Sequence, residues 1–292
     1  MPLISCLGVG PSRIKSVSLA LAVACGLAAL AAGCATLPEP SAAPPSSQPG
    51  PRAISSPASP KPTIVLLHGA FEDASSWSKV TQQLQSEGFP VIAPAVQLRG
   101  VASDTAAVEG LLDSVHGPKV LVGHSYGGLL VSELASKTPD VTALVYVAAF
   151  IPRAGESAGM LNAQFPGSLI GPATTHQVNS PDGAELYVNT ASFPELFAAS
   201  GSSTDTADAA VEAAGQRPIL AAAFDEKVAT TAPAQIRKYA IVATDDKAIP
   251  PAAEHFEAQR AGAVITEVHS PHAVPAANPR AVVDVVLRAA AG

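Results

Sequence analysis

One pentapeptide of this 292-residue chain has the residue types and spacing that nucleophilic catalysis needs. Gly123, His124, Ser125, Tyr126 and Gly127 form a G-x-S-x-G pattern between the apolar run KVLV and a stretch with helical composition. A sharp turn from strand to helix exposes the serine hydroxyl, and small residues two positions before and after it let the backbone bend. The free N–H groups at the start of the following helix favour negative charge at that point. The pattern therefore predicts Ser125 as a nucleophile.

A serine hydroxyl needs a base, and seven histidines could supply it. In this arrangement the base follows the last strand of the sheet, which favours His269 and His272. His269 directly ends the run AVITEV, whereas His272 lies beyond a Ser-Pro pair in a loop, so we prefer His272. His176 stays an alternative. The carboxylate that orients the base should follow the run KYAIVAT, where Asp245 and Asp246 are equally suitable by residue type.

Short apolar runs alternate with helix-like segments along most of the chain. Strands are expected at residues 63–68, 89–96, 119–123, 141–150, 238–244 and 263–268, and helices at 75–87, 105–116, 126–137, 252–260 and from 280 onward. This alternation predicts an α/β fold, a mostly parallel sheet of about six strands with helices on both faces. The alternation stops between residues 151 and 233. Helix-like pieces and aromatic residues there predict a small helical cap above the carboxyl ends of the strands.

The first 33 residues differ from the rest of the chain. Two basic residues precede an unbroken run of small and apolar residues that ends at Gly33, which is the order of a secretory signal. The end of this run is similar to the lipobox of bacterial lipoproteins, which implies that Cys34 is lipidated. An ordinary cleaved signal and an uncleaved anchor are the alternatives. Residues 34–60 are rich in Pro, Ser and Ala and predict a flexible tether, so we expect residues 61–292 to form an exported domain anchored on the bacterial cell envelope.

Composition excludes several classes of function. The chain has 24 acidic and 17 basic residues and a net charge of −7, without a basic run, so we expect no nucleic-acid partner. Its three cysteines, Cys6, Cys25 and Cys34, lie within or at the end of the signal-like segment. The domain that follows therefore has no cysteine for a disulfide, a metal site or a thiol nucleophile. We expect neither a metal nor a cofactor.

Four segments, LLHGAFEDASSW, VLVGHSYGG, ATDDKAIP and SPHAV, together resemble a known family. They are similar to the plant methylesterase and hydroxynitrile lyase branch of the α/β-hydrolase superfamily and its bacterial esterase relatives, from about Thr63 to the C-terminus. The resemblance implies an α/β-hydrolase fold. It also implies a catalytic triad of Ser125, Asp246 and His272, because the family places its carboxylate immediately before the lysine of the acid motif.

The resemblance also implies an oxyanion hole and a choice between two activities. The family's H-G-A motif places the first oxyanion N–H on Ala70, and the second comes from Tyr126, the residue after the nucleophile. The lyases of the family carry Thr at the position of Gly69 and Lys at the position of Ala273. These two differences place the sequence on the esterase side.

These observations predict a serine carboxylic-ester hydrolase that acts on small or medium apolar esters through an acyl-enzyme intermediate. Phe71, Trp77, Met160 and Phe165 are candidates to line an apolar substrate pocket. The alternatives are a ligand-binding protein or a perhydrolase-type enzyme with the same triad. The expected partners are a small ester substrate and a membrane reached through the lipid anchor, and the oligomeric state is open.

Overall fold

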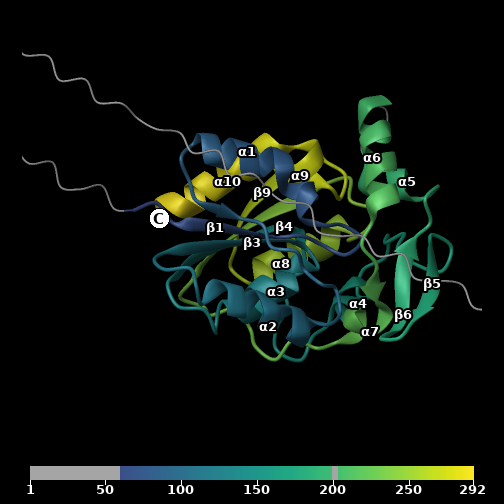
Figure 1. Cartoon of the computed structure of the whole chain (residues 1–292), viewed down its shortest axis with the longest axis horizontal. Helices are drawn as coiled ribbons and strands as arrows, with labels where there is room; N and C mark the ends of the chain where they lie inside the picture. Colours follow the sequence, from purple (N-terminus) through teal and green to yellow (C-terminus); the bar gives the residue numbers. More distant parts are fainter. Residues whose placement is uncertain (1–59, 199–202) are drawn as a thin grey trace, which may run out of the picture. The chain divides into compact units, whose positions relative to one another are not determined.

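The computed structural model describes residues 60–198 and 203–292, and within them the chain forms a six-stranded parallel sheet with helices on both faces (Figure 1). The strand order is β2-β1-β3-β4-β8-β9. The strands are β1 (Thr63–Leu67), β2 (Val91–Ile92), β3 (Lys119–Ser125), β4 (Val141–Ala149), β8 (Arg237–Ala243) and β9 (Val264–Val268). The expected α/β-hydrolase fold is confirmed. The expected signal segment, Cys34 and the tether lie outside the described residues.

The central strands are continuously apolar because both of their faces are covered. Every residue of β1 is buried. Ile64 and Leu66 pack into the hydrophobic core on one face of the sheet, whereas Val65 and Leu67 pack into the core on the other. A strand buried in this way needs an apolar side chain at each position, which explains the run TIVLL.

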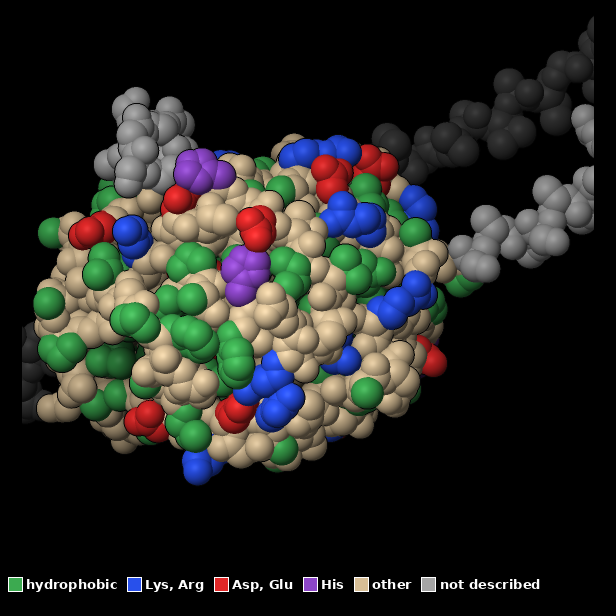
Figure 2. Space-filling model, turned by 180° about the vertical axis from the view of Figure 1, so that it is seen from behind, with side chains coloured by type: hydrophobic (Ala, Val, Ile, Leu, Met, Phe, Trp, Pro, Cys, Tyr) green, Lys and Arg blue, Asp and Glu red, His purple; other side chains and the backbone are tan. Residues whose placement is uncertain are grey.

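Two groups of helices cover the two faces. The first face carries η1 (Ala74–Trp77), α1 (Ser78–Ser86), α9 (Val274–Ala277) and α10 (Pro279–Ala291). The second carries α2 (Val101–Leu112), α3 (Gly127–Leu134) and α8 (Pro251–Arg260). None of the helices in residues 60–198 and 203–292 combines the length and the apolar character that crossing a membrane requires. Figure 2 shows acidic and basic side chains interspersed over one face of the described part.

The extent of β2 and the start of α2 differ from the sequence expectation because of contacts with other segments of the chain. The strand expected at residues 89–96 is reduced to Val91–Ile92, which pairs only with β1 at the edge of the sheet. The helix expected from residue 105 begins at Val101. The Glu226 carboxylate accepts hydrogen bonds from the N–H groups of Val101 and Ala102 at 2.8 and 2.9 Å and so caps this helix. A cap supplied from the other half of the chain leaves no signal near the helix.

The cap between β4 and β8 is more varied than the sequence indicated. It contains the expected helical pieces as α4 (Ala158–Asn162) and α6 (Ser203–Gly215), together with α5 (Phe193–Phe197) and α7 (Ala221–Asp225). It also contains an antiparallel sheet of β5 (Thr175–Ser180), β6 (Gly183–Val188) and β7 (Ile219–Leu220). The middle of β5 is exposed, so its sequence THQVNS carries no apolar alternation that would predict a strand.

Two glycine substitutions test how closely the elements pack. A Cβ atom at Gly128 in α3 would lie 2.2 Å from the carbonyl oxygen of Phe150, a backbone atom that cannot move aside. We expect Gly128→Ala to lower the free energy of unfolding by about 2 kcal/mol or more, measured by urea denaturation. The matched control is Gly110→Ala in α2, where no atom lies within 4 Å of the new Cβ. We expect this control to raise the stability by up to about 1 kcal/mol, and equal effects of the two changes would contradict the packing argument.

Candidate active site

Ser125 lies at the turn between β3 and α3, with its backbone in the left-handed region at a φ of 53°. A non-glycine residue in this region is strained, and such strain is typical of residues at functional sites. The flanking glycines are required by close contacts. A Cβ atom at Gly123 would lie 2.5 Å from the Gly127 carbonyl oxygen, and one at Gly127 would lie 2.4 Å from that of Leu67. The G-x-S-x-G pattern therefore forms the sharp turn that the sequence analysis expected.

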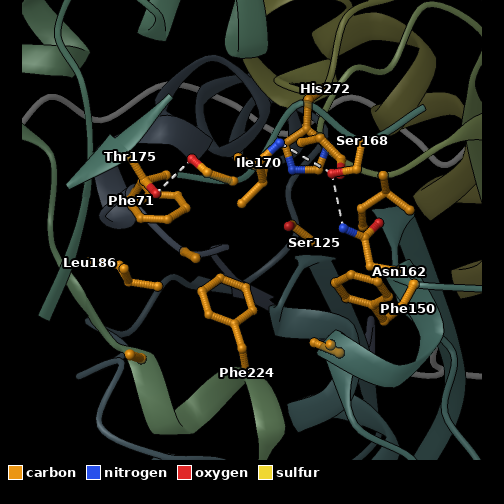
Figure 3. Close-up of a pocket in the computed structure, with 18 of the residues that line it drawn as sticks. Phe71, Ser125, Phe150, Asn162, Ser168, Ile170, Thr175, Leu186, Phe224 and His272 are labelled. Atoms are coloured by element: carbon orange, nitrogen blue, oxygen red, sulfur yellow. Dashed lines mark hydrogen bonds between the residues drawn. The ribbon is translucent and has the colours of Figure 1, made fainter. Parts of the chain in front are cut away.

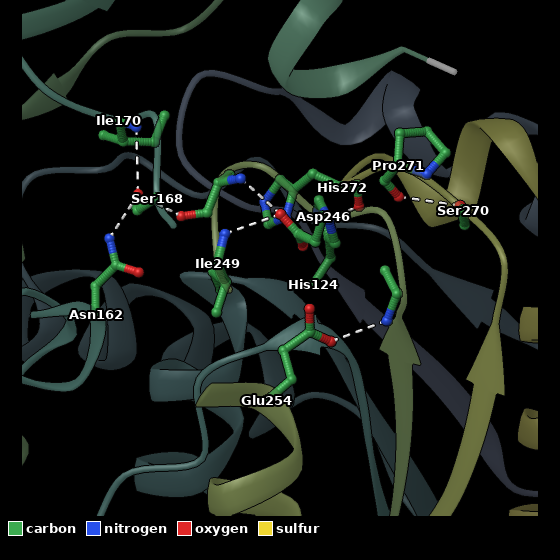
Figure 4. Close-up of polar contacts among 12 residues, drawn as sticks. His124, Asn162, Ser168, Ile170, Asp246, Ile249, Glu254, Ser270, Pro271 and His272 are labelled. Atoms are coloured by element: carbon green, nitrogen blue, oxygen red, sulfur yellow. Dashed lines mark hydrogen bonds and ion pairs between the residues drawn. The ribbon is translucent and has the colours of Figure 1, made fainter. Parts of the chain in front are cut away.

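A buried histidine–aspartate pair lies beside this turn (Figure 4). His272 Nδ1 donates a hydrogen bond to Asp246 Oδ2 at 2.5 Å, and both side chains are buried. The other carboxylate oxygen of Asp246 accepts hydrogen bonds from the N–H groups of Ala248 and Ile249 at 2.6 and 2.8 Å. The hydrogen bond to Asp246 leaves Nε2 of His272 available to accept a proton.

The other two candidates form a separate pair at the surface. His269 Nδ1 lies 2.7 Å from Asp245 Oδ2, and the His269 side chain is 88% exposed. Asp245 and Asp246 are adjacent in sequence, but only Asp246 points into the interior. The third candidate base, His176, lies in the cap and contacts the amide oxygen of Asn189 at 2.8 Å rather than a carboxylate. Of the alternatives left open by the sequence, the pair of His272 and Asp246 is the one that is both buried and oriented.

Glu254 in α8 adds a second buried carboxyl group close to Asp246 (Figure 4). Its Oε2 atom accepts a hydrogen bond from the N–H group of Ala243 at 3.1 Å. Burial and the neighbouring Asp246 carboxylate raise the pKa of Glu254 well above its usual value. This shift favours the neutral form of Glu254 beside Asp246.

Ser125 and His272 both line a cavity of ≈ 840 Å³ below the cap (Figure 3). Much of its wall is aromatic or aliphatic, with Phe71, Phe150, Ile170, Leu186, Phe197 and Phe224. Its other polar side chains, besides Ser125 and His272, are those of Asn162, Ser168, Thr175, His176, Gln177 and Asp225. Among the described residues, no lysine or arginine lines this cavity. The cavity is therefore mainly apolar, and the Ser125 hydroxyl and the His272 imidazole lie in its wall.

Of the four residues expected to line the pocket, Phe71 does so and three do not. Trp77 is fully buried in the core between the sheet and the helices α1 and α10, and the centre of its ring lies 6.3 Å from that of His124. Met160 is 45% exposed on α4, and its neighbour Gly159 lines the cavity instead. Phe165 packs against Phe256 of α8. These expectations were wrong because residue type does not reveal which side of a short element faces the cavity.

The Ala70 main chain is oriented by a buried histidine. His68 Nδ1 donates to the Gly69 carbonyl oxygen at 2.9 Å, and His68 Nε2 accepts from the N–H group of Val96 at 3.0 Å. Burial lowers the pKa of His68, which agrees with a neutral ring that has one donor and one acceptor nitrogen. The C=O and N–H of a trans peptide point in opposite directions. The Ala70 N–H is therefore turned away from His68, and Ala70 lines the cavity.

Tyr126 is the second candidate for an oxyanion hole. Its phenol hydroxyl donates to Asp104 Oδ2 at 3.0 Å, and burial raises the pKa of both groups. This contact fixes the residue that follows Ser125. Neither the Ala70 nor the Tyr126 N–H donates a hydrogen bond to another residue in the described part of the chain. Two unused donors near the serine hydroxyl are what a developing oxyanion requires.

Several residues of the site were not predicted from the sequence. Phe150, Phe197 and Phe224 come from β4 and from two cap helices, and only the tertiary fold brings them to one cavity. Glu72, two residues after Ala70, is buried against His124, and no local pattern singled it out. No group of three or more His, Cys, Asp or Glu side chains within residues 60–198 and 203–292 is arranged to hold a metal ion.

Comparisons with known sequences support the resemblance. A model of the Alpha/beta hydrolase family matches residues 64–285. Over 107 residues the chain is 29% identical to the carbendazim hydrolyzing esterase of Nocardioides sp. (strain SG-4G), which covers 32% of this chain and 44% of that protein. Over 124 residues it is 32% identical to methylesterase 2 of Arabidopsis thaliana, covering 37% of this chain and 47% of that protein. The matched part thus spans about half the length of these relatives.

Solved structures resemble the described part more completely. The crystal structure of a pyrethroid hydrolase from Sphingobium faniae JZ-2 has a TM-score of 0.64 and 20% identity, and covers 79% of this chain and 98% of that chain. The similarity to plant methylesterases and bacterial esterases that the sequence indicated is confirmed. With a family model that matches most of the chain and a sheet of the same architecture, this chain belongs to the Alpha/beta hydrolase family.

Proposed function

We propose that this protein is a serine carboxylic-ester hydrolase. The observation that carries the proposal is the oriented, buried pair of His272 and Asp246, which opens onto the same cavity as Ser125 on its strained turn. Relatives named as esterases support ester hydrolysis in general. We propose further that the reaction uses a triad of Ser125, His272 and Asp246 and passes through an acyl-enzyme intermediate.

In the proposed mechanism, Ser125 Oγ attacks the ester carbonyl while His272 Nε2 takes its proton. Asp246 holds the His272 tautomer and stabilises the imidazolium that forms. The N–H groups of Ala70 and Tyr126 stabilise the oxyanion of the tetrahedral intermediate. His272 then returns the proton to the leaving alcohol. A water molecule, deprotonated by His272, cleaves the acyl-enzyme, releases the acid and regenerates the serine hydroxyl.

The cavity favours neutral esters. Its wall is mainly aromatic and aliphatic, and the one carboxylate side chain that lines it among the described residues is Asp225. A substrate carboxylate bound there would lose hydration, and no lysine or arginine among the described residues lines the cavity to pair with it. The volume of ≈ 840 Å³ lies in the range typical of pockets for small organic molecules. We therefore propose small or medium uncharged esters as the substrates.

Replacement of the nucleophile tests the mechanism. We expect Ser125→Ala to lower kcat/KM for p-nitrophenyl acetate by roughly 10³-fold or more, because the other hydroxyl of the turn, that of Tyr126, is bonded to Asp104. The control is Ser86→Ala on the exposed side of α1, which should hydrolyse the ester at the wild-type rate. A fluorophosphonate probe should label the wild type and the control but not Ser125→Ala. Labelling without repeated turnover in the wild type would instead indicate a ligand-binding protein.

Substrate charge tests the assignment of the cavity. We expect p-nitrophenyl butyrate to be hydrolysed at least about tenfold faster than mono-p-nitrophenyl succinate, because the succinate carboxylate must be buried unpaired. Leu186→Arg would place a cation on the cavity wall and should reduce this preference. Equal rates for the two esters in the wild type would contradict the proposed binding mode.

We also propose that the protein is exported and lipidated at Cys34. In a bacterial host fed a labelled fatty acid, the wild-type protein should carry the label and sediment with membranes. Cys34→Ser should lose both properties, whereas the matched control Cys25→Ser should keep them, because the small residues that precede Cys34 suit the lipobox. Loss of the label in Cys25→Ser alone would move the site to Cys25.

A further inference from the structure

A second buried pair of an acid and a histidine lies beneath the cavity. Glu72 follows the Ala70 loop, and His124 directly precedes Ser125. His124 Nδ1 lies 2.8 Å from Glu72 Oε2, with side-chain exposures of 0% and 3%. This pair has no part in the proton transfers described above.

His124 also contacts the main chain of the proposed base. Its Nε2 atom lies 2.9 Å from the carbonyl oxygen of His272, and the centres of the two rings are 4.7 Å apart (Figure 4). A carbonyl oxygen only accepts, so Nε2 of His124 carries a hydrogen. The same His272 carbonyl accepts a bond from the N–H group of Val274 at 2.7 Å. His124 and Val274 together hold the loop that carries the imidazole.

The protonation state follows from these contacts. Both ring nitrogens of His124 face acceptors, so the ring donates from both and is an imidazolium beside the Glu72 carboxylate. Burial alone would lower the pKa of His124, but the adjacent Glu72 carboxylate and the two hydrogen bonds raise it above its ordinary value. Burial alone would raise the pKa of Glu72, but His124 lowers it below the usual range. The positive charge of His124 and the negative charge of Glu72 therefore cancel.

The pair connects all three parts of the site. Glu72 Oε2 accepts a long hydrogen bond from the N–H group of Gly69, at 3.4 Å, immediately before Ala70. His124 belongs to the turn that carries Ser125. His124 also bonds to the main chain of the base His272, which lies 148 residues further along the chain. One pair of side chains thus touches the segments that hold the oxyanion donor, the nucleophile and the base.

We propose that Glu72 and His124 are positioning residues that hold the main chain of His272, so that its imidazole stays directed between Asp246 and Ser125. This inference rests on the proposed function. Stability alone does not require an ion pair at this place, because well-packed apolar side chains of similar volume fill such sites equally well or better. An apolar pair would lack the hydrogen bond to the His272 carbonyl. A displacement of a catalytic group by about 1 Å can reduce a rate by about 10²-fold.

Two neutral variants separate positioning from simple packing. Glu72→Gln removes the charge of the carboxylate, so that changes at His124 leave no unpaired buried ion. On this background, His124→Asn places an amide nitrogen near the position of Nδ1, and His124→Gln places one near Nε2. Only the glutamine can reach the His272 carbonyl. We expect E72Q/H124N to lose about ten- to a hundredfold in kcat with KM within about twofold, and E72Q/H124Q to keep kcat within about threefold of E72Q.

The control and a second readout complete the test. Glu133 is also buried and accepts a hydrogen bond from the N–H group of Thr230 at 2.9 Å, away from the cavity, so Glu133→Gln should leave kcat unchanged. The NMR resonance of the proton between His272 and Asp246 needs no turnover. It should shift or broaden in E72Q/H124N and persist in E72Q/H124Q. If E72Q/H124N does not fold, E72Q/H124F repeats the comparison with an apolar ring.

The outcomes distinguish the two proposals. A wild-type protein that hydrolyses no ester would reject the proposed function, while the proton resonance would still decide whether His124 positions His272. Equal kcat values and an equal resonance in the asparagine and glutamine variants would overturn the positioning role. A loss of kcat that only follows the loss of stability, in Glu133→Gln as much as in the His124 variants, would overturn it as well.

Discussion

The close approach of backbone at the turn after β3 is the constraint on which the rest of the site depends. Gly123, Gly127 and Gly128 pack so tightly against neighbouring carbonyl groups that a Cβ atom at any of them would lie within 2.5 Å of a backbone oxygen. These contacts bring α3 down onto β1 and the end of β4. They leave Ser125 in the left-handed conformation, with its side chain at the cavity. The strain at one residue is balanced by the packing of the elements around it.

Three buried carboxyl groups, those of Asp246, Glu72 and Glu254, belong to the site or its immediate surroundings. Asp246 receives two N–H groups and an imidazole, Glu72 receives an imidazole, and burial beside Asp246 raises the pKa of Glu254 well above its usual value. Asp246 and Glu72 therefore each have a histidine as a partner. The raised pKa of Glu254 favours its neutral form, which avoids repulsion between two adjacent carboxylates. The carboxyl groups of Asp246 and Glu72 thus each have a hydrogen-bonded partner in the interior.

The prediction of the fold succeeded where the signal was local and periodic. The buried strands β1, β3, β4 and β8 are each built around an apolar run, because both faces of a parallel sheet are covered. The prediction was less complete at β2, β5 and the start of α2. The first is a two-residue edge strand, the second has exposed polar residues, and the third is capped by Glu226 from the other half of the chain. The exposed β5 leaves no apolar alternation in its own sequence, and the cap of α2 leaves no signal near the helix.

The sequence by itself determined the fold and indicated the proposed type of chemistry, because a glycine-flanked serine between a strand and a helix, followed in order by an acid and a histidine after later strands, forms a pattern with a known geometry. Only the tertiary structure decided which side chains point inward. It separates Asp246 from Asp245 and His272 from His269 by burial, and it removes Trp77, Met160 and Phe165 from the cavity. It also joins Glu72 to His124. The physical reason is that burial and side-chain direction arise from contacts between segments far apart in the chain, which adjacent residues do not encode.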